Sequence, residues 1–210
     1  MDKIMTLLEG FGLNTAIFFC TLLGALPLGL AIMFCTRSSN KMVAGLFRGI
    51  VWVVRGTPLM LQLIAVFYLP SLIFEWAMPR TVAAIVAFII NYACYFSEIF
   101  RGGLDAIPVG QYEAGQVLGL TRTQVFFKVI LMQVVKRIVA PMGNEIITLI
   151  KDTSLANIIA VPELIMVSKR FLAKGILWPF FSTAIFFLVF TGITTLVLNR
   201  CEKKLNYYKL

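Results

Sequence analysis

The stretch RGGLDAIPVGQYEAGQVLGLTRTQVFFKVILMQVVKR, residues 101–137, decides how this chain folds, because it is the one long polar interruption in a sequence that is 60% hydrophobic. Its local signals predict two short helices joined by a tight turn. The first helix would end at Gly119, where a glycine at C′ tolerates the left-handed conformation. A second helix would begin at once, since Thr121 and Gln124 have the spacing of a capping box.

Apolar runs flank this polar stretch on both sides and are long enough to cross a membrane. About 20 apolar residues cover the ~30 Å hydrocarbon layer of a bilayer. The runs that reach this length are residues 13–35, 58–76, 81–100, 138–161 and 176–198. With only 14% charged residues, the chain is predicted to be an all-α integral membrane protein. We expect about five transmembrane helices in a single domain that covers residues 1–210.

Lysine and arginine predict the orientation, because they concentrate in cytosolic segments near the ends of spans. If the N-terminus lies outside, the cytosolic segments hold the larger set: Arg37, Lys41, Arg48, Arg55, Arg101, Arg122, Lys128, Lys136, Arg137, Arg200, Lys203, Lys204 and Lys209. The outer segments then hold Lys3, Arg80, Lys169, Arg170 and Lys174. This bias favours an outside N-terminus and a cytosolic C-terminus. The net charge of +9 is therefore a topology signal, and no nucleic-acid partner is expected.

The polar stretch and several motifs around it resemble the permease subunits of ABC importers. Glu113-Ala114-Gly115 followed by Gly119 is similar to the EAA loop of those subunits. The motifs similar to the polar amino acid branch of the family are RGTPLMLQ (55–62), EIFRGG (98–103), IPVGQ (107–111), GNE (143–145) and KDTSL (151–155). The chain departs from the loop motif at Gly115, where Ala is preferred, and at Met132, where Pro is usual. Both departures concern local helix geometry.

The resemblance implies a subunit of an ATP-driven, binding-protein-dependent importer for a polar amino acid in the bacterial inner membrane. It implies an ABC ATPase dimer, a second permease subunit that is identical or homologous, and an extracytoplasmic substrate-binding protein. Glu113, Ala114 and Gly119 would couple the chain to the ATPase. No cofactor is expected in this chain, because it has no G-x-x-x-x-G-K-[ST] phosphate loop and the ATPase would bind ATP and Mg.

The apolar run 138–161 contains charges at a depth where a lone lipid-facing charge costs several kcal/mol. Glu145 and Asp152 lie about two helical turns apart, and Lys151 adjoins Asp152. The sequence Asp152-Thr153-Ser154 can break the helix, and such breaks near the midplane build substrate sites in transporters. An amino acid needs acceptors for its ammonium group, so these carboxylates are candidate ligands.

The predicted substrate site has Glu145 as the acceptor for the ammonium group, with Asp152 beside it. Asn144, Thr148 and Thr153 would position the ligand. The alternative is that Glu145, Lys151 and Asp152 satisfy one another as a structural triad that holds the helix break.

The third apolar run presents Asn91, Tyr95 and Glu98 on one helical face. Polar groups at membrane depth normally face the protein interior. Asn91 is therefore expected either to contact the transported molecule or to make an interhelical hydrogen bond. Glu98 is expected to form a structural ion pair with Arg101.

Two other functions are compatible with a polar membrane interior. An ATP-independent channel or secondary carrier would use the charges of the fourth run as an ion path. An intramembrane enzyme is disfavoured, because the sequence has no histidine and no compelling Ser-Lys or paired-Asp arrangement. The absence of histidine also excludes histidine metal sites.

Overall fold

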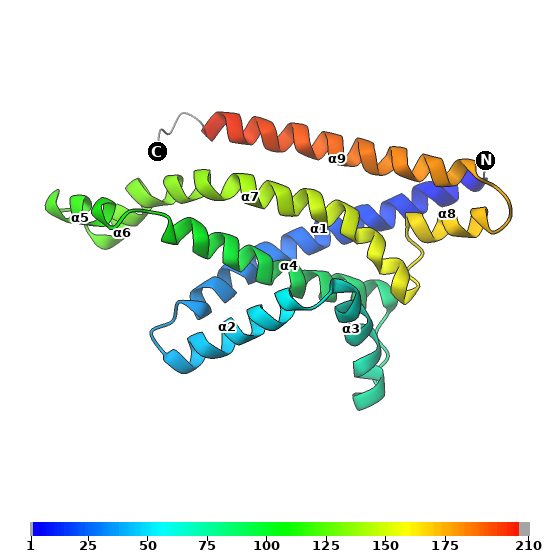
Figure 1. Ribbon diagram of the computed structural model, residues 1–210, viewed down its shortest axis with the longest axis horizontal. Helices are drawn as coiled ribbons and strands as arrows, with labels where there is room; N and C mark the ends of the chain where they lie inside the picture. The colour runs from blue at the N-terminus through cyan, green and yellow to red at the C-terminus, as the bar shows by residue number, and fades with distance from the viewer. Residues whose placement is uncertain (1, 206–210) are drawn as a thin grey trace.

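The computed structural model describes residues 2–205, and every regular element in that range is a helix (Figure 1). The first four are α1 (Asp2–Thr36), α2 (Lys41–Gly56), α3 (Leu59–Phe74) and α4 (Arg80–Asp105). The polar stretch forms α5 (Val109–Val117), α6 (Arg122–Val125) and a π-helical turn (Phe126–Ile130). The last are α7 (Leu131–Asp152), a 3₁₀ helix (Thr153–Ile159), α8 (Leu164–Leu172) and α9 (Trp178–Leu205). The all-α class is confirmed.

Helix α4 lies at the centre of the molecule and contacts α1, α2, α3 and α7 (Figure 1). Small side chains allow this close packing, as they do in other membrane helix pairs. Ala83, Ala84 and Ala87 of α4 are all buried. On α1, an added Cβ at Gly29 would lie only 2.9 Å from the carbonyl oxygen of Ala93. The α1 and α4 backbones therefore approach more closely than larger residues would permit.

Three helices are long and apolar enough to cross a membrane: α1 over Lys3–Thr36, α4 and α9. Helices α2 and α3 pass this test only as a pair, and they are bent by 110° where they meet. The expected span at 58–76 is thus the second part of a bent pair whose first part, α2, packs against α1 and α4. By length and composition the described chain has three candidate spans, or four if the bent pair counts as one.

The fourth expected span, residues 138–161, is not one continuous α-helix. Helix α7 ends at Asp152, and the chain continues as the 3₁₀ helix Thr153–Ile159. Ala160 then adopts the left-handed conformation with φ of 58°, which turns the chain toward α8. The change of helix type occurs at the position where the sequence predicts a break.

The turn between α5 and α6 forms as predicted. Gly119 has φ of 73°, and its amide donates to the carbonyl of Gln116 at 2.9 Å. The amide of Leu120 donates to the carbonyl of Gly115 at 3.0 Å, which completes a Schellman motif. Thr121 caps α6, and its capping box with Gln124 is present. These bonds satisfy the free backbone groups at both helix ends.

Candidate functional site

A polar cavity of about 450 Å³ lies where the α2–α3 bend, the middle of α4 and the C-terminal half of α7 meet. Its lining residues come from all three of these places: Arg55, Gly56, Thr57, Pro58, Leu59, Asn91, Tyr92, Tyr95, Glu145, Thr148 and Asp152. We refer to it as the central cavity. Most of the side chains that line it are polar, which is unusual for helices that sit in an apolar solvent.

Helix α7 contributes Glu145, Thr148 and Asp152, which are three and seven residues apart and so share one face. The hydroxyl of Tyr92 on α4 donates to Oδ2 of Asp152 at 2.8 Å. Glu145 is half-buried and has no hydrogen bond or ion pair with any other described residue. Its carboxylate is therefore free to accept from a ligand.

Lys151 does not take part in the structural triad that the sequence left open. Its side chain is exposed, and within residues 2–205 it forms no ion pair with Glu145 or Asp152. Asp152 bonds to Tyr92 instead. Both carboxylates of α7 thus line the central cavity without an ion pair to Lys151.

The α2–α3 bend is held by Gln62. Its Nε2 donates to the carbonyl oxygens of Val54 at 2.7 Å and Thr57 at 3.1 Å, neither of which accepts from a backbone amide within α2. Its Oε1 accepts from Nδ2 of Asn91 at 3.0 Å. Asn91 therefore makes an interhelical hydrogen bond and also lines the central cavity.

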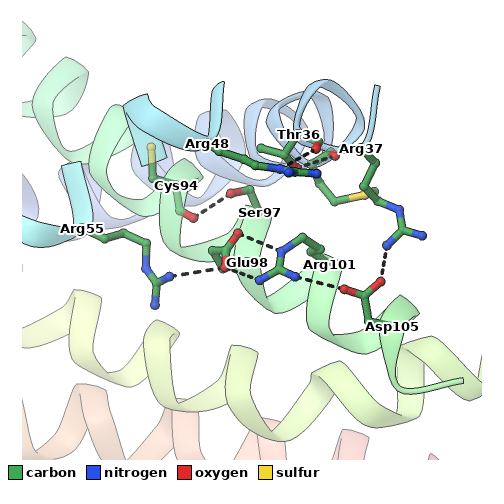
Figure 2. Close-up of polar contacts among 10 residues, drawn as sticks. Thr36, Arg37, Arg48, Arg55, Cys94, Ser97, Glu98, Arg101 and Asp105 are labelled. Atoms are coloured by element: carbon green, nitrogen blue, oxygen red, sulfur yellow. Dashed lines mark hydrogen bonds and ion pairs between the residues drawn. The ribbon is translucent and has the colours of Figure 1, made fainter. Parts of the chain in front are cut away.

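Arg55 is the last basic residue of α2 and lies at one end of a ladder of ion pairs along α4 (Figure 2). Its Nη1 lies 3.5 Å from Oε2 of Glu98, and Nη2 of Arg101 lies 2.7 Å from the same oxygen. The ladder continues from Arg101 to Asp105 at 3.0 Å and from Asp105 to Arg37. The predicted Glu98–Arg101 ion pair is present.

A second hollow of about 500 Å³ borders the central cavity on the side of this ladder. Its lining residues are Arg48, Val51, Trp52, Arg55, Glu98 and Arg101. Arg55 lines both spaces. Its guanidinium carbon also lies 5.1 Å from the ring centroid of Tyr95, within the range of a cation–π contact.

Two of the predicted substrate residues lie outside the central cavity. Asn144 lines a separate hollow of about 110 Å³ between α7 and α9. Thr153 is buried, where its hydroxyl accepts from Nδ2 of Asn14 at 2.9 Å and donates to the carbonyl of Ile150 at 2.7 Å. The cavity thus brings together Asn91, Glu145, Thr148 and Asp152 of the predicted set.

Asn14 belongs to a buried polar cluster that the sequence did not reveal. The carboxylate of Glu163 caps α8 by accepting from the amides of Ile165 at 2.9 Å and Met166 at 2.7 Å. It also accepts from Nδ2 of Asn14 at 3.3 Å, while Oδ1 of Asn14 accepts from the amide of Leu164 at 3.0 Å. Every polar group here has a partner, so the cluster joins α1 to α8 as a structural element.

The predicted coupling residues lie at one end of the molecule, away from the N-terminus (Figure 1). Glu113 and Ala114 are exposed on α5, and Gly119 is exposed in the turn that follows. Val117 and Leu118 beside them are 88% and 77% exposed, although both are apolar. Apolar side chains are therefore exposed at the end of the α5–α6 pair.

Comparison with known proteins supports a common origin over nearly the whole chain. The family described as "Binding-protein-dependent transport system inner membrane component" matches residues 25–207. The L-cystine transport system permease protein TcyB of Bacillus subtilis is 34% identical over 185 residues, which cover 86% of this chain and 78% of that protein. The glutamine transport system permease protein GlnP of Escherichia coli K12 is 31% identical over 207 residues, covering 96% and 94%.

The fold is also that of a solved transporter. A crystal structure of an amino acid ABC transporter with histidines superposes with a TM-score of 0.88 at 26% identity. The superposition covers 97% of this chain and 95% of the chain in that structure.

Proposed function

This chain belongs to the family of binding-protein-dependent transport system inner membrane components, and we propose that its central cavity holds the amino acid during import. It is the permease subunit of an ABC importer for polar amino acids and a multi-pass protein of the inner membrane. The permease is the non-catalytic membrane component, and ATP hydrolysis belongs to a separate subunit. The family membership decides against the ATP-independent channel or carrier that the charges alone left open.

The observation that supports the site best is the carboxylate of Glu145. An ionisable group at membrane depth without a partner is costly, and such groups mark transport pathways. Glu145 faces the central cavity and has no bonding partner among the described residues. We propose that it accepts from the α-ammonium group of the amino acid. Asp152, oriented by Tyr92, adds a second acceptor nearby.

In this proposal, two of the other predicted residues contact the ligand and two act on it indirectly. Asn91 and Thr148 line the cavity and contact the amino acid directly. Asn144 and Thr153 position it through the helix. The Thr148 hydroxyl donates to the carbonyl of Asn144 at 3.0 Å, and Thr153 ties the end of α7 to Asn14 of α1.

We further propose that α5 and α6 dock on the ATPase. The family implies an ATPase and a binding protein as partners, and two ATPases with a second permease would complete the assembly. Glu113, Ala114 and the Gly119 turn would form the contact, supported by the exposed apolar residues Val117 and Leu118. Closure of the ATPase dimer on ATP would then move α4 and α7, which α5 and α6 connect, between inward and outward states.

This arrangement requires a cytosolic α5–α6 pair, so we propose an outside N-terminus and a cytosolic C-terminus. The distribution of Lys and Arg supports this orientation. Figure 1 is consistent with it, since the end of α9 lies toward the same end of the molecule as α5 and α6, and the N-terminus lies at the other end.

Reconstitution of the complex tests the site. The chain would be coexpressed with its ATPase and binding protein, and uptake of an amino acid panel into liposomes would be measured. Glu145→Gln should lower uptake at least tenfold while the subunits still copurify, because the ammonium group loses a charged acceptor. Glu9→Gln changes an exposed carboxylate of α1 outside the cavity and is the matched control. Unchanged uptake of every amino acid by Glu145→Gln would reject the site.

A further inference from the structure

We propose that Arg55 determines specificity in the central cavity by binding the α-carboxylate of the amino acid. This proposal rests on the function proposed above, in which Glu145 binds the ammonium group. It adds the residue that recognises the acid end of the ligand, and it distinguishes amino acids from amines and amino acid amides.

The balance of charge in the cavity favours a carboxylate beside Arg55. Its lining includes the carboxylic acids Glu145 and Asp152, and Arg55 is the only lysine or arginine among the residues that line it. An amino acid brings a carboxylate into this space. Without a cation, that carboxylate would meet two others at low dielectric, where like charges repel strongly. Arg55 is the group placed to offset this repulsion.

Arg55 is available to bind a ligand. Its contact with Glu98 is long, at 3.5 Å, and its side chain is 41% exposed. Glu98 does not depend on this contact, because Arg101 donates to both of its oxygens, at 3.0 and 2.7 Å. Arg55 can therefore turn toward a ligand without leaving the half-buried carboxylate of Glu98 unpaired.

The guanidinium group of Arg55 is oriented by an aromatic ring. Tyr95, which also lines the cavity, supports it at 5.1 Å from the ring centroid. A guanidinium group stacked on a ring keeps its N–H donors at its edge, where they match a carboxylate with two hydrogen bonds. Figure 2 shows the Arg55 side chain extending from α2 toward Glu98, with Arg101 on the other side of that carboxylate.

Arg55 lies at the α2–α3 bend, beside the N-terminal end of α3. Pro58 and Leu59, the start of α3, line the same cavity. The N-terminal end of a helix has a partial positive charge, and discontinuous membrane helices use such ends toward anionic groups. The ligand would thus lie with its carboxylate at the bend and its ammonium group at α7.

Direct binding to the permease–ATPase complex in nanodiscs, without the binding protein, tests the proposal. The probes are L-glutamine with L-glutaminamide and L-arginine with L-argininamide, since each amide keeps the ammonium group but loses the negative charge. Of the two amino acids, the one that binds the wild-type complex more tightly should bind at least tenfold more tightly than its own amide. Arg55→Gln should reduce this preference to within twofold, and Arg55→Lys should retain part of it.

Arg48→Gln is the matched control, because Arg48 is also an arginine of α2 but lines only the second hollow and donates to the carbonyl of Thr36, not to Glu98. It should keep the preference of the wild type. A tenfold preference retained by Arg55→Gln, or an equal loss in Arg48→Gln, would overturn the role of Arg55 while leaving the cavity as a binding site. If the Glu145→Gln variant binds the amino acids and their amides as tightly as the wild type does, the proposed function is rejected instead.

Discussion

At the scale of single residues, Gln62 holds the geometry that exposes Arg55 to the central cavity. It bonds to two carbonyl groups at the α2–α3 bend and to Asn91 of α4. All three partners would lose a bond if the amide were removed. A backbone carbonyl without a partner is especially costly in an apolar solvent, where water is scarce.

Gln62→Leu should therefore lower the free energy of unfolding by about 1–3 kcal/mol, the cost of leaving polar groups unpaired, among them the amide of the buried Asn91. The measurement is unfolding of the purified protein in mixed micelles by added denaturing detergent. Gln116→Leu is the control, because Gln116 is exposed on α5. A loss no larger than that of the control would mean that water replaces the bonds of Gln62.

The acidic residues of the cavity could be predicted from the sequence, whereas its basic residue Arg55 could not. Glu145, Asp152 and Asn91 stand out because they are polar residues within apolar runs. Tyr92 gave no such signal, since its partner Asp152 lies 60 residues away along the chain. Arg55 was counted as a cytosolic charge, because the bend that brings it into the cavity depends on tertiary packing.

Two of the predicted residues lie outside the cavity because of the rotation of successive residues around a helix. Asn144 adjoins Glu145, but consecutive residues of an α-helix are about 100° apart around its axis. Asn144 therefore faces α9, while Glu145 faces α4. Thr153 follows the change to a 3₁₀ helix, where the α-helical period no longer predicts its direction.

At the scale of elements, the α5–α6 pair was predictable because its signals are local. The left-handed Gly119 and the capping box of Thr121 and Gln124 depend on residues a few positions apart, and both are confirmed. Met132 stands where the loop motif usually has proline. It is the second residue of α7, which begins at Leu131 directly after the π-helical turn. A proline there would disturb the preceding turn of helix.

Gly119→Val should weaken the turn by about 1–2 kcal/mol, because a left-handed conformation brings the Cβ of an L-residue too close to the backbone. We expect less ATPase to copurify with this variant and coupled uptake to fall, while direct amino acid binding persists. Gly110→Val is the control, since Gly110 is in α5 with open space around it. Normal ATPase association by Gly119→Val would argue against the turn as part of the docking element.

Gly115→Ala addresses the other departure from the loop motif. A Cβ at this position would lie 2.4 Å from Cγ2 of Val125, so α5 and α6 would have to separate or Val125 would have to move. We expect ATP-driven uptake to fall at least threefold, although alanine favours helices more than glycine does. The double variant Gly115→Ala/Val125→Ala should recover most of the loss. Failure of the second change to restore uptake would show that crowding against Val125 is not the cause.

At the scale of the whole molecule, composition identified the long apolar helices but not the bend. Helices α1, α4 and α9 satisfy the simple requirements of length and hydropathy. Helix α2 has only 16 residues, with Arg48 and Arg55 among them, and so resembles a surface segment. Its packing against α1 and α4 is a long-range property that no local pattern encodes.

The proposed orientation predicts the side from which the chain can be labelled. Replacing Cys20, Cys35 and Cys94 by alanine leaves Cys201, which is exposed near the end of α9. A membrane-impermeant maleimide should label this protein in inside-out vesicles and not in intact spheroplasts. Lys3→Cys in the cysteine-free protein, in which Cys201 is also alanine, should show the opposite pattern. Labelling of Cys201 from outside would reverse the topology.

The ion-pair ladder of α4 has a thermodynamic consequence. It begins at Arg55 beside the cavity and reaches Asp105, the last residue of α4, and α5 begins at Val109. If a ligand draws Arg55 away from Glu98, the ladder in the loaded permease differs from that in the empty one. Linkage is reciprocal, so an ATPase that binds the loaded form more tightly must raise the affinity of the permease for its ligand by the same factor. The two subunits would then share one binding equilibrium.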